Sequence, residues 1–431
     1  MKTRILLTPA ACALALGCVV LVPRSAQAGG IDLYEIATPD VGLASAGYSA
    51  RAQDASTLFK NPAGMSLLQG SQAQGGLQML YGNVQFTPDA GSSARLGRND
   101  GGNALGALPG GSFFYVDDLM ERVKVGVGAF SYFGLAEKYN DNWVGRYYVQ
   151  QAAVLGMSFM PAASLKVTDW LSVGGGPNVM FGYLKDKTAI NNQTPGFPDG
   201  QLSLQDRTWG VGGIGGILIQ PREGTRFGAT YVSPVNLDFS PTPTIGGVVP
   251  SLGTALANRS QLNLGVTVPQ TVMFGIYQDL CPKWAVMADV GWQDWHQFGE
   301  ATVSVQGPGG AQTQTITTER LEYQNTWHGA IGLQYRYSEK WQFTGGFAYD
   351  TSAVSDSNRG IVLPMGQAYR YGLGAEYQLN EKLNIGAAYE FVWMGDMPVT
   401  QGSDANSRGR VSGSFNNAWI SFFTLNLTYK F

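Results

Sequence analysis

The chain of 431 residues is poor in charged side chains, in histidine and in cysteine. Charged residues make up only 14% of it, and 28 basic residues stand against 31 acidic ones, a balance that argues against a nucleic-acid partner. Two histidines, without a serine-centred nucleophile elbow or a cluster of metal ligands, give little support to an enzyme. We therefore expect neither catalysis nor a cofactor.

The one long apolar run lies at the start of the chain. Lys2 and Arg4 precede apolar residues 5–22, and the tripeptide Ala-Gln-Ala at 26–28 fits a signal peptidase site. We predict a signal peptide over residues 1–28. Its removal takes three basic residues and no acid, which changes the net charge from −3 to −6.

The three cysteines do not form a disulfide framework. Cys12 and Cys18 leave with the signal, so Cys281 remains alone in the mature chain. Acylation of Cys18 is the alternative, but Ala15 stands where lipoprotein signals usually carry a bulky aliphatic residue.

Past the signal, no apolar run approaches the roughly 20 residues that a membrane-spanning helix needs. The chain holds 58 glycines, and 12% of its residues are aromatic. A secreted chain with this composition and without a spanning helix is built from strands.

The C-terminal segment alternates with a period of two. Polar Thr424, Asn426, Thr428 and Lys430 occupy one parity, and the other is apolar, with Trp419, Phe423, Leu425, Leu427, Tyr429 and Phe431. A membrane barrel requires this pattern, because its outer face meets lipid and its closed sheet pairs every backbone donor. The terminal Phe431 is similar to the signal that outer-membrane assembly machinery reads.

Upstream segments repeat this design, with connectors that alternate in length. We predict short periplasmic turns near 116–122, 167–169, 221–225, 278–283, 338–340 and 379–381. Long external loops are expected near 87–110, 134–147, 185–205, 237–260, 299–319, 351–367 and 395–415. Six turns and seven loops predict an all-β transmembrane antiparallel barrel of about fourteen strands over residues 71–431, in the bacterial outer membrane. Segments such as 210–216 are less regular because glycine marks a bend as readily as a strand.

Residues 29–70 do not alternate. They contain short helix-like pieces broken at Asn61-Pro62 and are too few to bury a core of their own. We predict that they form an N-terminal hatch, a plug inside the lumen.

Three stretches resemble the FadL-type transporters. Residues 52–57 (Ala-Gln-Asp-Ala-Ser-Thr) with 61–65 (Asn-Pro-Ala-Gly-Met) are similar to the hatch signature of that family. Residues 132–135 with Tyr139 and 143–147 are similar to the end of its third strand and the following loop. The third match, near the last external loops, comprises Asp350, Arg359, Leu363-Pro364 and residues 369–372.

This resemblance implies passive uptake of hydrophobic molecules, either long-chain fatty acids or aliphatic and aromatic hydrocarbons. It implies an internal pocket touched by the mature N-terminus (Gly29, Gly30 and Ile31) and a hatch shaped by Asn61 and Pro62. It also implies sideways release at the third strand, residues 123–133. In that strand we expect the bend at Gly126 and Gly128, with Phe133 and Gly134 at its end.

Several polar residues have a second interpretation. Lys124, Arg336 and Arg370 are candidates to bind a fatty carboxylate, or they pair with lumen acids such as Glu376 and Glu390. Trp292 and Trp295 are expected in an interfacial aromatic girdle.

Two other functions stay open at this point. A general diffusion porin would have an open lumen without a plug, and a barrel hydrolase would rely on Asp294 and His296 on one strand face. The expected partners are a hydrophobic ligand, outer-membrane lipids and the barrel assembly machinery. We expect a monomer.

Overall fold

The computed structural model describes residues 33–34, 36–250, 261–298, 300–306, 314–320 and 322–431. The predicted signal peptide lies outside these residues. None of the helices in the described part of the chain is long and apolar enough to cross a membrane.

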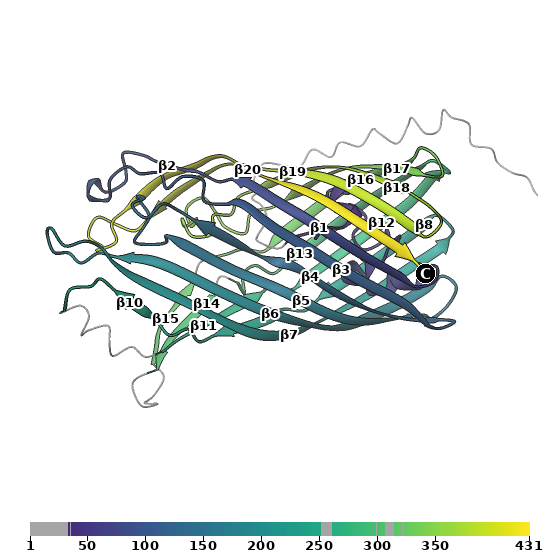
Figure 1. The fold of residues 1–431 in the computed structure, drawn as a ribbon, viewed down its shortest axis with the longest axis horizontal. Helices are drawn as coiled ribbons and strands as arrows, with labels where there is room; N and C mark the ends of the chain where they lie inside the picture. Colours follow the sequence, from purple (N-terminus) through teal and green to yellow (C-terminus); the bar gives the residue numbers. More distant parts are fainter. Residues whose placement is uncertain (1–32, 35, 251–260, 299, 307–313, 321) are drawn as a thin grey trace, which may run out of the picture.

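Fourteen antiparallel strands form a closed barrel within the described residues (Figure 1). Residues 72–83 of the first strand pair with residues 419–430 of the last, and this pairing closes the sheet. In order around the wall the strands are β1 (Gln72–Asn83), β3 (Gly106–Met120), β4 (Val123–Lys138), β5 (Gln151–Lys166), β6 (Leu171–Ile190), β7 (Gly200–Arg222), β8 (Thr225–Val232), β12 (Thr271–Cys281), β13 (Trp284–Gln293), β16 (Thr326–Arg336), β17 (Trp341–Asp350), β18 (Ala368–Gln378), β19 (Leu383–Gln401) and β20 (Val411–Lys430).

The two faces of the wall differ as the alternation predicts. In β20 the side chain of Leu425 is 62% exposed, whereas its neighbours Thr424 and Asn426 are buried in the lumen. Exposed leucine, phenylalanine and tryptophan recur on the outer face of the other strands. The outer surface thus offers lipid an apolar band.

Short turns gather at one end of the barrel and long connections at the other, as predicted. The strands reach further into the connectors than expected: β4 continues to Lys138, β6 to Ile190, and β7 begins at Gly200. Some predicted loops also contain strands. These are β2 (Phe86–Pro88), β9 (Val235–Phe239), β10 (Thr244–Gly246), β14 (Glu300–Gln306) and β15 (Gln314–Arg320), while β11 (Gln261–Val268) directly follows the predicted loop 237–260; a short helix, η5 (Ala94–Leu96), precedes β3.

Four of these loop strands form a second sheet in the order β15-β14-β11-β9. Val235, Leu237 and Phe239 of β9 are fully buried. They lie over Gly182 of β6 and Gly210 of β7, where any side chain would collide with them. This part of the predicted loop 237–260 is therefore a structured inner layer.

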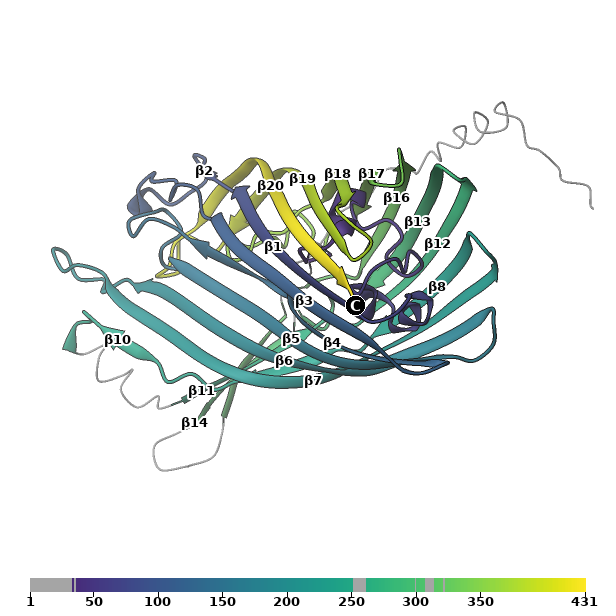
Figure 2. The ribbon, with the colours of Figure 1, turned by 45° about the vertical axis from the view of Figure 1, so that its right-hand side comes forward.

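The hatch lies inside the barrel toward the end with the short turns, and the first barrel strand begins at Gln72 (Figure 2). It contains η3 (Pro39–Leu43), α1 (Thr57–Lys60) and η4 (Pro62–Leu67). Glycines on the lumen face of the wall admit its backbone. A Cβ atom at Gly228 would lie 1.9 Å from the carbonyl oxygen of Ser49, and one at Gly346 would lie 1.8 Å from that of Leu43.

Charged groups fix the hatch in place. Arg51 is ion-paired with Asp40 at 2.7 Å, with Asp54 at 2.8 Å and with Glu376 of β18 at 3.2 Å. Lys60 contacts Asp40, and burial lowers the pKa of Lys60 to about 7 despite the opposing effect of nearby carboxylates.

The wall also holds the hatch backbone directly. The carboxylate of Asp289 in β13 accepts hydrogen bonds from the backbone N–H groups of Gly47, Tyr48 and Ser49. Three consecutive backbone donors of the hatch thus meet one side chain of the wall.

Candidate functional site

The wall opens between β3 and β4. Their pairing runs from Met120 and Val123 at the turn to Ser112 and Phe130, and it ends there. Beyond this point β3 still pairs with β1, while β4 pairs with β5 after a register shift between Phe130 and Phe133. The two strands therefore separate in the half of the barrel that carries the long loops.

Gly134 lies just past this bulge and has a φ of +137°, a conformation that favours glycine. A Cβ atom there would lie 2.4 Å from the carbonyl oxygen of Val154 on β5. Close approach of β4 to β5 thus requires a glycine at this position, and the strand leaves β3 as it bends.

A cavity of about 640 Å³ occupies the opening; we call it the wall cavity. Residues 108–111 of β3 lie on one side of it and residues 129–131, 133 and 134 of β4 on the other. Leu33 and Ile36 of the hatch segment close it from within. No charged residue is among its described lining residues.

A second cavity, the inner cavity, lies deeper in the lumen and has a free volume of about 70 Å³. Its lining is mainly aliphatic and includes Val84, Leu105, Met365 and Val392. Both cavities share Leu33, Leu80 and Gly134, so they adjoin at the bulge of β4.

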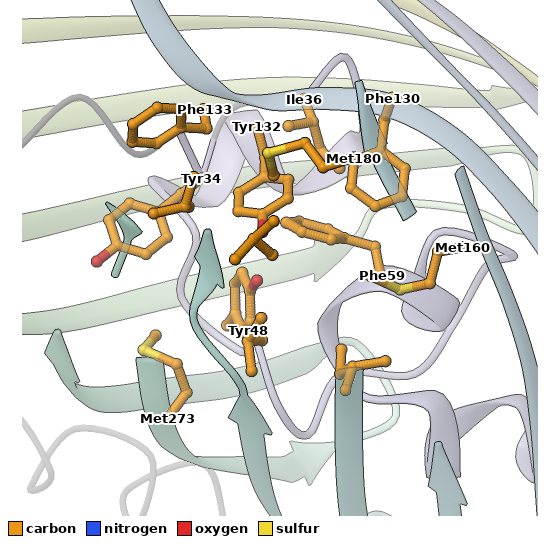
Figure 3. Packing of buried hydrophobic residues seen from close by; sticks show 14 of the residues in the cluster. Tyr34, Ile36, Tyr48, Phe59, Phe130, Tyr132, Phe133, Met160, Met180 and Met273 are labelled. Carbon is orange, nitrogen blue, oxygen red and sulfur yellow. The ribbon is translucent and has the colours of Figure 1, made fainter. Parts of the chain in front are cut away.

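Aromatic side chains join the hatch to the bulged strand (Figure 3). The ring of Phe59 lies 4.5 Å from that of Phe130 and 5.6 Å from that of Tyr132, measured between centroids. Tyr34 packs edge-on against Tyr48 at 6.0 Å. The α1 helix of the hatch therefore packs directly against the strand that borders the opening.

A buried polar network lies beside the inner cavity. Nδ1 of His328 is 2.6 Å from a carboxylate oxygen of Asp350, and Arg370 contacts Asp350 and, at 3.3 Å, Glu390. The ring of Tyr34 covers the guanidinium group at 5.3 Å. Sequence reasoning missed His328; its position on the lumen parity of β16 was the available signal.

A comparison with protein families assigns the chain to one of them. The family described as outer membrane protein transport protein (OMPP1/FadL/TodX) matches residues 19–431. The chain belongs to this family. It is an outer-membrane transport protein, as its barrel and the sequence resemblance both indicate.

Relatives match along their full length. The long-chain fatty acid transport protein of Escherichia coli O6:H1 is 24% identical over 466 aligned positions that cover 100% of both chains. Outer membrane protein P1 of Haemophilus influenzae is 24% identical and covers 96% of this chain and 97% of its own.

Solved structures of the family share the fold. A FadL homologue of Pseudomonas aeruginosa superposes with a TM-score of 0.83 at 21% identity, over 93% of this chain and 100% of that one. The CymD monoaromatic hydrocarbon channel gives a TM-score of 0.67 at 18% identity, over 93% of this chain and 99% of that one.

The bend of this FadL/TodX-family wall does not lie at Gly126 and Gly128, so that expectation was wrong. Both glycines sit in the regular pairing of β4 with β3 and β5. A Cβ atom at Gly126 would lie 2.6 Å from Leu58 of the hatch, and one at Gly128 would lie 3.0 Å from Phe114. These glycines make room inside the lumen, whereas Phe133 and Gly134 lie at the bulge itself.

The other predicted hatch residues fall into two groups. Gly29, Gly30 and Ile31 lie outside the described residues. Asn61 is fully buried and does not line either cavity. Its side-chain amide donates to the carbonyl oxygens of Ser49 at 2.7 Å and of Ile217 in β7 at 3.0 Å, while its oxygen accepts from the N–H of Ala63. Pro62 follows as the first residue of η4.

The three candidate cations all have carboxylate partners. Lys124 contacts Asp118, and Arg336 is 2.7 Å from Asp279; neither cation lines the two cavities. Arg370 alone lines the inner cavity, where Asp350 and Glu390 engage it. The pairing interpretation therefore describes all three in this structure.

Two further expectations were wrong. Trp295 is fully buried, donates to the side-chain oxygen of Gln293 at 2.9 Å and is not part of an outer girdle. Asp294 and His296 do not share a strand face, because β13 ends at Gln293 and the chain turns there. The geometry that a hydrolase would need is absent at these residues.

Proposed function

We propose that this FadL/TodX-family protein takes up hydrophobic small molecules passively, holds them in the adjoining inner and wall cavities and releases them sideways between β3 and β4. The observation that carries the proposal is the shared boundary of the two cavities, which leads from the lumen to a break in the wall. Relatives named for long-chain fatty acids and monoaromatic hydrocarbons support these two substrate classes.

The physics of such solutes favours this route over an aqueous pore. Each methylene group gains about 0.8 kcal/mol when it leaves water for an apolar site. A molecule with several such groups moves readily between adjoining apolar cavities and onward into lipid, whereas it gains nothing from a wide aqueous channel.

The beginning of the hatch is the proposed gate. Leu33 lines both cavities, and Gly29, Gly30 and Ile31 directly precede its segment. Asn61 and Pro62 hold the body of the hatch against β7, so a shift of the N-terminal residues can open the boundary while the plug stays in place. The proposed working unit is a monomer in contact with outer-membrane lipids, assembled by the barrel assembly machinery.

Filling the wall cavity tests the exit. Gly110 lines the wall cavity with the inward parity of β3, and a Cβ placed there lies in ordinary contact, 3.7 Å from its nearest atom, so Gly110→Trp is the variant to make. Uptake of radiolabelled alcohols and hydrocarbons by cells should fall at least about tenfold, equivalent to about 1.4 kcal/mol.

Gly329→Trp is the control for an added tryptophan as such, because a Cβ there meets no atom within 4 Å and the site lies on the outer face of β16, away from the opening. Normal uptake by Gly110→Trp at an equal level of folded protein would leave passage down the barrel axis as the better description. High conductance of the wild-type protein in planar bilayers would instead favour a diffusion porin.

A further inference from the structure

The two cavities contain almost no charge. Among their described lining residues, only Glu137 and Arg370 are ionisable as acid or strong base, and both lie on the inner cavity. The charge that a ligand head group would meet is therefore set by these two side chains and their partners.

The positive charge of Arg370 is already engaged. The side chain is buried and contacts two carboxylates, Asp350 and Glu390, which are themselves buried. Asp350 also contacts His328, so the guanidinium group is one member of a closed network of buried acids and bases, and a carboxylate ligand would have to displace one of its partners.

Glu137 is a further buried acid that lines the inner cavity. One of its oxygens accepts from the backbone N–H of Leu363 at 3.1 Å, and the other accepts from the hydroxyl of Tyr139 at 3.2 Å. Burial raises the pKa of Tyr139 well above its ordinary value, so its hydroxyl remains a donor. No ion pair involves Glu137 within the described part of the chain.

Glu137 also stands where a ligand would pass. It follows the bulge of β4, and its bond to Leu363 ties that strand to the connection between β17 and β18 at the end with the long loops. A carboxylate entering here would lose its water and lie beside the oxygens of Glu137, and among the described lining residues the one cation, Arg370, already has acidic partners.

We propose that this route selects uncharged hydrophobic molecules, such as hydrocarbons, alcohols or esters, and excludes ionised carboxylates. The inference rests on the proposed function, since it assigns the substrate class of the same two cavities. It separates the two classes for which the relatives are named.

Two ligands with the same alkyl chain and different head groups test this inference. Equilibrium binding of radiolabelled dodecan-1-ol and dodecanoate to the folded protein in detergent is measured at about pH 8, where the acid is ionised. The alcohol should bind at least about tenfold more tightly. Equal binding of dodecanoate overturns the inference and leaves the proposed function standing, whereas failure of both ligands to bind overturns both.

Two variants test whether Glu137 and Glu390 cause the exclusion of carboxylates. Glu137→Gln keeps the size of the side chain and should raise the affinity for dodecanoate several-fold while the alcohol is unaffected. Glu390→Gln, which removes one partner of Arg370, should act in the same direction. Glu223→Gln in the exposed turn between β7 and β8 is the control. An unchanged preference in both cavity variants, with heat-modifiable folding intact, would contradict the proposal.

Discussion

The backbone N–H of Leu33 donates a hydrogen bond of 2.6 Å to the carbonyl oxygen of Tyr132. Tyr132 lies inside the bulge of β4, between Phe130 and Phe133, where the pairing register shifts. The carbonyl group that the bulge frees from the β-ladder is thus satisfied by the hatch. The beginning of the plug and the break in the wall are joined by one bond.

If the hatch beginning is the gate, deletion of residues 29–31 should speed the release of a bound hydrophobic ligand and lower its occupancy, because the bond from Leu33 to Tyr132 then lies next to the start of the chain and breaks more easily. Native mass spectrometry of the purified protein measures occupancy, and a chase with unlabelled ligand measures release. The heat-modifiable barrel should form in normal amount. Occupancy and release equal to those of the full mature chain would rule out gating by these residues.

Asn61→Ala should loosen the plug without unfolding the barrel. The change removes two amide donors from the carbonyl oxygens of Ser49 and Ile217 and the cap of η4, and each buried polar group left unsatisfied costs about 1–3 kcal/mol. We expect a larger and fluctuating conductance in planar bilayers and faster proteolysis within the hatch. Gln69→Ala, at an exposed position near the end of the hatch, is the control. The absence of conductance with either variant would show that Asn61 does not hold the plug.

Removal of Phe431, or its replacement by Ser, should lower the amount of folded barrel in the outer membrane. The N–H of Phe431 donates to Ser71 at 3.0 Å, and its ring packs edge-on against Tyr115 at 6.0 Å, so it secures the seam where β20 meets β1. The heat-modifiable band in membrane fractions measures the effect. Leu379→Ser, in a turn at the same end and 47% exposed, should fold normally. An equal loss in both variants would indicate a general cost of polarity and not a terminal signal.

Much of the barrel follows from local pattern. The alternation in 419–431 identifies β20, and polar clusters such as 338–340 identify turns, because both depend on residues close in sequence. The glycine-rich segment 210–216 was harder to interpret. Its glycines accommodate β9 and Asn61, which come from elsewhere in the chain, so no local pattern could reveal their purpose.

The position of the bend was beyond local prediction for the same reason. Gly126 and Gly134 look alike in the sequence, yet the first makes room for the hatch and the second allows close approach to β5. Which strand partner continues and which stops depends on pairing across the sheet. An ion pair between a lumen cation such as Arg370 and Glu390 was among the expectations, but the contacts of His328 and Asp350 were not, since the members of this network lie on four different strands.

The glycine contacts between hatch and wall limit where motion can occur. At Gly346 and Gly228 the hatch backbone contacts the wall backbone with no side-chain layer between them, so the plug cannot move closer to the wall at these positions. A rigid-body movement of the whole plug would have to break these contacts on several strands at once. Ala37 makes the same close contact at Gly76 of β1, where a Cβ atom would meet its carbonyl oxygen, so a movement that leaves the plug seated must begin before this residue.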